Sequence, residues 1–453
     1  MSDTDQKKDC LSDEPENMGQ KEGSIVEGQG MRKLDITLMS IISILYLFNY
    51  LDRNNISQAK LDSFTEDLGL QGNDYSVAVS IVNVGYILMQ LPSNMILTKV
   101  RPSLYIAFWV IVWSSVSAAT AGTHNFEGLI GVRITLGVCE APFFPGKELA
   151  LRYAVLYSGF VLATATSGLL AAAIFAGLDG ASGLPGWRWL FIIVGAMSLV
   201  FGVLALVLLP DLPGANTGSA RWLFNEKQHQ IAVERMRRDA VSNQEDNTSL
   251  RHGLRLAIMH IKVWIFAFIM CSSQSAYGFN YFYPTIVEGF GLGARTITLA
   301  CTAPPYIVGA FVSYCVAWSS DRRKERGFHI LTPVLVAIAG FIVSVATLNI
   351  PVRYFASFLY ISGIFGTNAV VFNWAATIVS DTAQKKACAM AIINLTGQLG
   401  SAPRYITAMI LLLVFAALEA LLCLSMKLFL RRKNRNLAAW GNEAGVVPNL
   451  YTL

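Results

Sequence analysis

The sequence predicts an all-α polytopic membrane protein with twelve transmembrane helices in two six-helix halves. Of its 453 residues, 54% are hydrophobic and 14% are charged, and the mean hydropathy is +0.47. Soluble domains carry about 25% charged residues, so this chain has too little polar surface to coat a soluble fold. The apolar residues also form continuous blocks of membrane-spanning length, which favours helices over the alternating strands of a barrel.

Twelve apolar blocks predict the twelve spans. They lie at 34–51, 75–97, 103–122, 126–146, 150–177, 187–209, 262–284, 296–319, 329–349, 353–379, 387–400 and 405–430. Most reach about 18 residues, enough for a helix to cross a ~30 Å hydrocarbon core, but the block at 387–400 is short.

The polar segments of the chain predict where its domains begin and end. Residues 1–33 are predicted to be a disordered tail, followed by a six-helix bundle at 34–210, a central loop at 211–261, a second bundle at 262–430 and a tail at 431–453. In the central loop, the amphipathic pattern at 222–238 predicts either a solvated linker helix or one on the membrane surface. Two similar halves favour a transporter, with its substrate site between them near the midplane.

The distribution of basic residues predicts that both termini are cytoplasmic. Of 35 lysines and arginines, 28 fall in the segments predicted to be inside, five in outside loops and two at or within spans. Cytoplasmic loops are enriched in Lys and Arg, so this asymmetry sets the orientation.

Ionisable residues inside spans are costly and mark candidate functional sites. The first span ends in FNYLDRNNIS, which places Asp52 and Arg53 near its outer end, where an interfacial ion pair is the alternative interpretation. In the fourth span, Arg133 and Glu140 are seven residues apart and project from one helix face. At about 10 Å of axial separation they cannot pair with each other. Each needs water, another span or an anionic ligand, or the two belong to a structural network.

An arginine and a carboxylate in one cavity suit the symport of an anion with a proton. A guanidinium can grip a carboxylate with two hydrogen bonds, and a buried glutamate can exchange a proton near neutral pH. Other candidates are polar residues of the seventh and tenth spans, where packing explains the aromatic side chains equally well: Gln274, Tyr277, Asn280, Tyr281, Asn368 and Asn373. Glu419 in the last span has no obvious partner in the sequence.

Seven motifs, in order along residues 31 to 435, carry a resemblance to a known family. They read YLDRNNIS, LPSNMILTKVRPS, RITLGVCEAPFFPG, KELALRYAVLYSGFVLA, GWRWLFIIVG, DRRKERG and APRYITAM. The chain resembles the fungal allantoate and vitamin permease branch of the anion:cation symporters, within the major facilitator superfamily. The resemblance implies that superfamily's fold and the uptake of small organic anions with protons.

The resemblance also implies roles for individual residues. Arg53 and Arg133 would bind the substrate anion, and Asp52 and Glu140 would couple transport to protons. The loop between spans eight and nine would gate the cytoplasmic side, together with a weaker equivalent between spans two and three that lacks the usual acidic residue. The gating residues would be Asp321, Arg322, Arg323 and Arg326, with Lys99 and Arg101.

Two departures from the family pattern predict that spans four and eleven are shortened. PFFPG is followed at once by Lys147, where similar proteins have roughly a dozen further residues, and Gly400 joins Ser401 without the usual polar turn. These gaps keep open the alternative of a transport-dead relative.

The leading prediction is a proton-coupled importer of a small carboxylate such as a vitamin or ureide. An exporter that works by proton antiport is the alternative within transport, but the fifth span lacks the proline of the usual Gly-Pro element. We find no catalytic or metal-binding motif and expect no enzyme activity, cofactor, metal or nucleic-acid partner. The expected partners are the anion, protons and the lipid bilayer, for a monomer in the plasma membrane.

Overall fold

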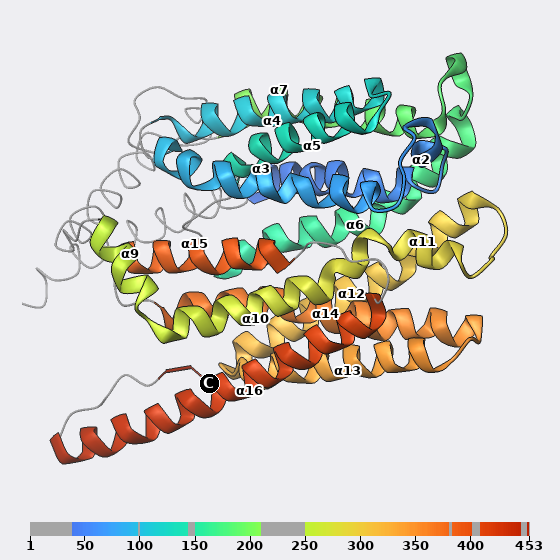
Figure 1. Cartoon of the computed structure of the whole chain (residues 1–453). Helices are drawn as coiled ribbons and strands as arrows, with labels where there is room; N and C mark the ends of the chain where they lie inside the picture. The colour runs from blue at the N-terminus through green and yellow to red at the C-terminus, as the bar shows by residue number, and fades with distance from the viewer. Residues whose placement is uncertain are drawn as a thin grey trace, which may run out of the picture.

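The computed structural model describes residues 39–97, 100–143, 150–209, 250–379, 383–400, 408–444 and 451–452. The predicted disordered tail and the predicted helix at 222–238 lie outside these ranges. Within them the regular elements are helices (Figure 1).

Twelve long helices in the described ranges correspond to the twelve predicted spans. The first covers residues 39–59. The others are α3 (Asp74–Leu97), α4 (Pro102–Ala119), α5 (Phe126–Glu140), α6 (Ala150–Leu178), α7 (Gly186–Leu208), α10 (Ile261–Tyr277), α12 (Arg295–Arg323), α13 (Gly327–Ala346), α14 (Ile350–Ile378), α15 (Ala383–Gly400) and α16 (Ala408–Ala444). The shorter helices are α2 (Phe64–Asp67), α9 (Leu250–Ile258) and α11 (Tyr283–Glu288), with single 3-10 turns that include η2 (Ala141–Phe143) and η5 (Gly278–Tyr281).

Six of these helices are long and apolar enough to cross a membrane on length and composition alone, among the described residues: α4, α7, α12, α13, α14 and α16. A seventh span arises if α9 and α10, which meet at a bend of 69°, are counted together. The remaining long helices include the first, which contains Asp52 and Arg53. A helix that faces a polar interior is less uniformly apolar, so composition alone underestimates the number of spans.

The observed helix ends correct the predicted spans. The first helix continues to residue 59 and not to 51, so Asp52 and Arg53 lie inside it and not at its end. Span eleven was predicted to have about 14 residues, but α15 has 18, because the helix begins in the polar segment at Ala383. α5 has only 15 residues before the 3-10 turn, about 22 Å of helix. The connection that follows, with Lys147, is outside the described residues.

The two halves meet along α6 and α12. In the first half α3 packs on α5 and α4 packs on α7, and in the second α13 packs on α14 and α10 packs on α15 and α16. Figure 1 shows α6 lying between the two groups of helices. Gly168 on α6 allows the close approach, because a Cβ atom there would lie 2.2 Å from Oγ1 of Thr302 and 2.8 Å from the carbonyl oxygen of Leu299 on α12.

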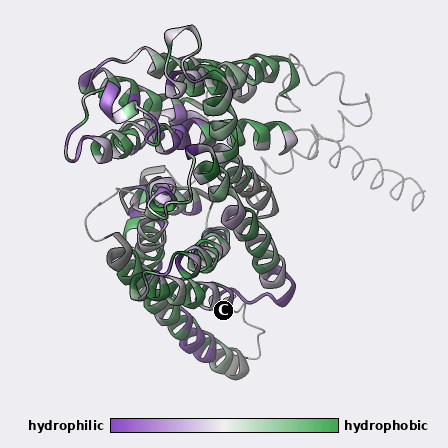
Figure 2. Cartoon of the chain, turned by 90° about the vertical axis from the view of Figure 1, so that its right-hand side faces the viewer, coloured by the Kyte–Doolittle hydropathy of each residue, from purple (hydrophilic) through white to green (hydrophobic). Residues whose placement is uncertain are grey.

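Large apolar side chains cover the outside of the bundle. On six different helices such a side chain is more than half exposed: Leu88, Phe108, Val207, Phe311, Phe355 and Leu421. Figure 2, viewed from the end of the molecule that holds α2 and α11, shows hydrophobic residues along most helices. An exposed apolar surface of this extent suits contact with lipid.

Ion pairs join the halves at the end of the bundle that holds α2 and α11, here called the α2 end. Arg295, the first residue of α12, pairs with Asp62, which follows the first helix, and with Asp179, which follows α6, at 2.8 Å. Asp62 also accepts a hydrogen bond from the backbone N–H of Trp187, and Asp179 accepts one from Gly186. Arg295 therefore links the second half directly to the segments that hold Asp62 and Asp179, and through these two residues to the start of α7. We call Arg295, Asp62 and Asp179 the Arg295 clasp.

Candidate functional site

A small pocket lies between the two halves and contains both arginines predicted to bind substrate. Its walls come from the first helix, α3, α5 and the 3-10 turn η5. The lining residues are Arg53, Ile56, Val79, Val82, Asn83, Arg133 and Tyr281. Six of them belong to the first half and Tyr281 to the second, so the pocket lies at the expected interface.

Arg53 forms a buried ion pair with Glu140 across the first half. Its Nε donates a hydrogen bond of 2.5 Å to Oε2 of Glu140, and the side chains are 9% and 0% exposed. This geometry rules out the interfacial alternative for Arg53, which would hold its side chain in water at the helix end. Glu140 thus finds its partner on another span, one of the possibilities left open by its distance from Arg133.

Arg133 has no comparable acidic partner among the described residues. Its side chain is 1% exposed, its guanidinium carbon lies 5.9 Å from the centroid of the Phe191 ring, and its Nε and Nη2 atoms have no hydrogen-bond partner in the described ranges. A buried charged donor without a partner is costly. With Glu140 bonded to Arg53, the pocket keeps an excess of positive charge, which an anion would neutralise.

Asp52 points away from the pocket. Its carboxylate accepts hydrogen bonds from Ser117 on α4, at 2.6 Å, and from Ser198 on α7, at 3.0 Å, and it is 0% exposed. The sequence places Asp52 and Arg53 side by side, but successive residues of a helix point about 100° apart. The interfacial alternative is therefore wrong for Asp52 as well, and the side chain ties three helices of the first half together.

Close packing of α3 and α5 sets the position of Arg133 and Glu140. A Cβ atom on Gly137 of α5 would lie 2.0 Å from the carbonyl oxygen of Val82 on α3. Only glycine allows this approach. Because Gly137 lies between Arg133 and Glu140, the contact places both side chains beside the pocket wall.

Tyr281 is a pocket residue that sequence reasoning grouped with its neighbours but did not single out. It ends η5, where the span that begins with α10 changes from α-helix to a 3-10 turn. Gly278 and Pro284 on either side were the available signal, because both interrupt helices. The interrupted backbone brings an aromatic side chain of the second half against the two arginines.

The other candidates from spans seven and ten do not line the pocket. Asn280 donates to Oδ1 of Asn54 at 3.4 Å and accepts a 2.6 Å hydrogen bond from Tyr306, which links the halves next to the pocket. Gln274 accepts a hydrogen bond from Asn368 at 3.4 Å. Asn373 is half-buried and is not among the pocket residues.

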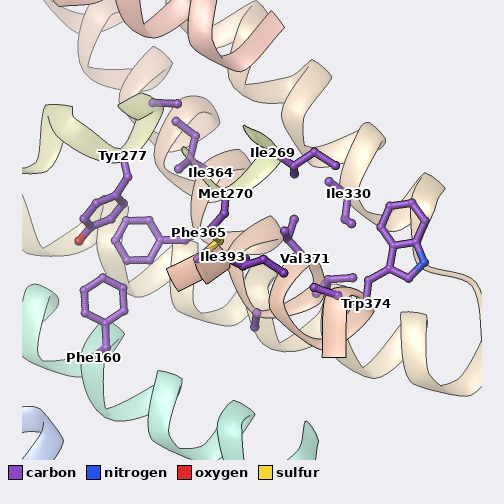
Figure 3. Close-up of a cluster of buried hydrophobic side chains, with 14 of the residues drawn as sticks. Phe160, Ile269, Met270, Tyr277, Ile330, Ile364, Phe365, Val371, Trp374 and Ile393 are labelled. Atoms are coloured by element: carbon purple, nitrogen blue, oxygen red, sulfur yellow. The ribbon is translucent and has the colours of Figure 1, made fainter. Parts of the chain in front are cut away.

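Tyr277 belongs to an aromatic seam between the halves. Its ring centroid lies 5.2 Å from that of Phe365 on α14 and 5.6 Å from that of Phe160 on α6, and Phe160 and Phe365 stack at 5.5 Å (Figure 3). Aromatic pairs at these separations stabilise packing. The aromatic ring of Tyr277 therefore packs between the halves, in agreement with the alternative that this side chain serves packing.

The predicted gating residues lie at the opposite end of the bundle. Asp321 pairs with Arg326 at 3.2 Å, Arg322 lies over the ring of Trp318, and Arg323 is exposed at the end of α12. Arg101 is exposed before α4, and Lys99 is outside the described residues. Among the described residues, the ion pairs at this end stay within the second half.

Glu325 is a central residue of this group that sequence reasoning missed. It pairs with Lys427 of α16 and with His329 at 2.9 Å, and it accepts a hydrogen bond from the backbone N–H of Phe328. Burial raises the pKa of Glu325, but the hydrogen bonds from Lys427, Phe328 and His329 outweigh burial and hold it below the usual value. The spacing of Glu325 and His329, four residues apart at a helix start, was the available signal.

Comparisons with known proteins agree with this architecture. The family model of the Major Facilitator Superfamily matches residues 42–403. The Schizosaccharomyces pombe protein named uncharacterized transporter C1002.16c is 32% identical over 424 residues, covering 89% of this chain and 83% of that protein. The major facilitator-type transporter hxnP of Emericella nidulans is 32% identical over 364 residues, covering 76% of this chain and 72% of that protein.

Solved structures show the same fold at low sequence identity. The xylose transporter XylE from E. coli, in a partially occluded inward open conformation, has a TM-score of 0.63 at 16% identity and covers 87% of this chain and 97% of its own. A bacterial homolog of the human lysosomal transporter Spinster has a TM-score of 0.62 at 15% identity, and the match covers 81% of this chain and 80% of that protein. The chain belongs to the major facilitator superfamily and is a multi-pass secondary transporter of the membrane, not an enzyme.

Proposed function

We propose that this transporter imports a small organic anion together with protons, as a member of the allantoate and vitamin permease branch of the anion:cation symporters. The observation that carries the proposal is the buried guanidinium of Arg133, which faces an interface pocket with two donor atoms unpartnered among the described residues. A carboxylate can accept two parallel hydrogen bonds from a guanidinium. Vitamins, ureides and related carboxylates therefore form the proposed substrate class.

The Arg53–Glu140 pair supplies a route to proton coupling. An anion that binds Arg53 competes with Glu140 for the same donor, and a Glu140 released from Arg53 becomes an uncompensated buried carboxylate. A proton that binds Glu140 removes that charge and leaves Arg53 free for the anion. Each ligand then favours binding of the other, as reciprocal coupling between two sites requires.

The proposed orientation places the α2 end outside the cell and both termini in the cytoplasm of a plasma-membrane protein. The excess of lysine and arginine in the predicted inside segments supports it. In this orientation the Arg295 clasp closes the outer side, and the Asp321 to Arg326 loop faces the cytoplasm. The protein is proposed to act as a monomer.

Uptake measurements test the proposal directly. Cells that express the chain at the surface would be given radiolabelled nicotinate, allantoate or biotin at external pH 5 and pH 7. We expect at least one anion to accumulate, and to accumulate faster at pH 5. Surface expression without proton-stimulated accumulation of any anion would count against an importer of this class.

Variants of the two charged groups separate substrate binding from coupling. Arg133→Ala is expected to abolish uptake, because it removes the unpaired donors. Arg255→Ala removes an exposed arginine on α9 and serves as the control for expression and net charge. Glu140→Gln is expected to keep exchange of labelled for unlabelled anion across the membrane but to lose the stimulation by acidic pH. Unchanged pH stimulation in Glu140→Gln would contradict the coupling role.

A further inference from the structure

Glu419 is a buried carboxyl group that the pocket does not use. It lies in the membrane-spanning part of α16, its side chain is 0% exposed, and neither carboxyl oxygen has a hydrogen-bond partner of ordinary geometry among the described residues. The hydroxyl groups of Ser273 on α10 and Thr367 on α14 lie beside it. An acidic side chain in this position must be neutralised or moved, because an isolated ion in hydrocarbon is very costly.

No described basic side chain neutralises Glu419. On its own helix Cys423 lies one turn away and donates to the carbonyl oxygen of Gly327, and Lys427 lies about 12 Å away along the axis. Lys427 is already paired with Glu325, which also holds His329 of α13.

The other neighbouring helices do not supply a cation from their described residues either. On α10 the nearest basic residue in sequence is Lys262, about 16 Å along the axis from Ser273. Its Nζ lies 3.5 Å from the centroid of the Tyr451 ring. On α14 the only basic residue in the described helix is Arg353, about 21 Å along the axis from Thr367. Among the described residues no side chain supplies the positive charge, which leaves a small ligand such as a proton as its source.

The hydroxyl groups fit a protonated acid. Thr367 donates its own hydrogen to the carbonyl oxygen of Ile364 at 2.9 Å, so its oxygen can only accept a further hydrogen bond. Ser273 is 0% exposed and its Oγ has no partner among the described residues, so it can donate. A carboxylic acid needs one acceptor for its O–H group, which Thr367 can be, and its carbonyl oxygen can accept from one donor, which Ser273 can be. A carboxylate needs donors only, and Thr367 becomes a donor to it only by giving up its hydrogen bond to Ile364.

Two of the three residues are sequence neighbours of the hydrogen-bonded amide pair of spans seven and ten. Ser273 precedes Gln274 and Thr367 precedes Asn368, and these two amides are hydrogen-bonded to each other. The site belongs wholly to the second half, whereas Asp52 and Glu140 belong to the first.

We infer that Glu419, Ser273 and Thr367 form a proton-binding site of the second half, in which the carboxyl group of Glu419 is protonated in this conformation. In the proposed site the protonated acid would donate to Thr367 and accept from Ser273, which would link three helices without leaving a buried charge. This inference does not depend on the identity of the transported substrate or on the coupling role of Glu140.

Infrared spectroscopy of the purified protein in lipid membranes tests the site, because a protonated carboxylic acid has its own C=O stretching band. We expect such a band at pH 7 in the wild type, a shift on exchange into heavy water, and its loss in Glu419→Gln. Ser273→Ala keeps the acid but removes the hydrogen bond to its carbonyl oxygen, so the band should move to higher frequency. The Ser115→Ala variant, an exposed serine of α4, is the matched control and should leave the band in place.

Three outcomes would overturn the inference. The first is an identical carboxylic-acid region in the wild type and Glu419→Gln at pH 7. The second is a band that Ser273→Ala and Thr367→Val leave unmoved, since the hydroxyl groups would then not contact the acid. The third is loss of the band when choline is replaced by sodium, which would assign the site to an alkali cation. The serine and threonine variants keep the test decisive even where Glu419→Gln fails to fold.

Discussion

The buried guanidinium of Arg133 has two donor atoms, Nε and Nη2, that find no hydrogen-bond partner among the described residues. Leaving a buried donor unsatisfied costs about 1–3 kcal/mol, and more when the donor is charged. The ring of Phe191 recovers part of this cost through a cation–π contact. The proposed planar anion would offset this cost by accepting hydrogen bonds from the guanidinium.

Arg133→Lys tests whether the fork geometry matters or only the charge. Lysine keeps the positive charge but cannot form two parallel hydrogen bonds to a carboxylate. We expect the apparent affinity for the anion to fall about tenfold or more, which corresponds to about 1.4 kcal/mol, with the maximal rate less affected. Concentration-dependent uptake measures both quantities, and an unchanged KM would show that a point charge is enough.

Glu325 gives a prediction for the pH dependence of stability. Its folded pKa is lower than the unfolded one, so its ionised form stabilises the protein above the unfolded pKa of about 4.3. This contribution is lost as the pH falls through the folded pKa. Glu325→Gln should therefore lower the Tm at pH 7. The corresponding loss in the free energy of unfolding is up to about 1 kcal/mol, as for a partly exposed ion pair. The difference from the wild type should disappear once the pH falls below the lowered folded pKa of Glu325, as thermal unfolding in detergent would measure, and a difference that persists in strong acid would contradict the assignment.

At the residue scale the sequence identified the buried charges but not their partners. Arg53, Arg133, Asp52 and Glu140 were found because charged residues are rare inside spans. The pairing of Arg53 with Glu140 depends on how the first helix is rotated against α5, and no pattern within one helix encodes that rotation. For the same reason an Asp52–Arg53 ion pair was an open alternative, whereas Asp52 bonds to serines of two other helices.

At the scale of single helices, α6 and α12 form the contact on which the two halves meet. Gly168 leaves no space for a side chain, because Thr302 Oγ1 and the Leu299 carbonyl occupy the position of a Cβ atom. Packing through small residues is a main source of helix association in membranes, where lipid and side chains are equally apolar.

Gly168→Ala should destabilise the protein and slow uptake, because the added methyl group pushes α6 away from α12. Gly177→Ala, on the same helix, is the matched control, because a Cβ atom there would have no neighbouring atom within 4 Å. It should leave both properties unchanged or slightly raise stability, since alanine favours helix. Tm and initial uptake rates would be compared for the two variants, and equal behaviour would show that the contact is not close in the membrane.

Helix existence was easier to predict from the sequence than helix ends. The apolar blocks located the spans, but the first helix continues through DRNNISQA to residue 59 because neighbouring helices bury those polar side chains. α15 likewise begins in the polar segment AQKK, so the apolar length of 387–400 underestimates the helix. Composition detects contact with lipid, whereas the polar part of the first helix is buried against protein.

At the scale of the whole molecule, the halves are joined by ion pairs at the α2 end. The hydrogen bond from Arg295 also holds the pKa of Asp179 below its usual value. The described ion pairs of the other end remain within one half. The clasp therefore biases the protein toward the arrangement that is closed at the α2 end.

Arg295→Gln should shift the protein toward an arrangement open at the α2 end. A cysteine placed in the pocket by Ile56→Cys would then react faster with a membrane-impermeant thiol reagent added outside the cell. Glu66→Gln changes an exposed charge at the same end and is the control. Equal labelling rates in the presence and absence of Arg295 would show that the clasp does not hold this end closed.

In the proposed orientation, the Arg295 clasp would also limit how tightly an external substrate can bind. A ligand that requires a minor conformation has an apparent dissociation constant equal to its intrinsic one divided by the fraction of protein in that conformation. If about 1% of the molecules were open at the α2 end, a substrate arriving there would bind about 100-fold more weakly than the pocket itself allows. Selection for uptake at low external concentration would then act on Asp62 and Asp179 as much as on the arginines of the pocket.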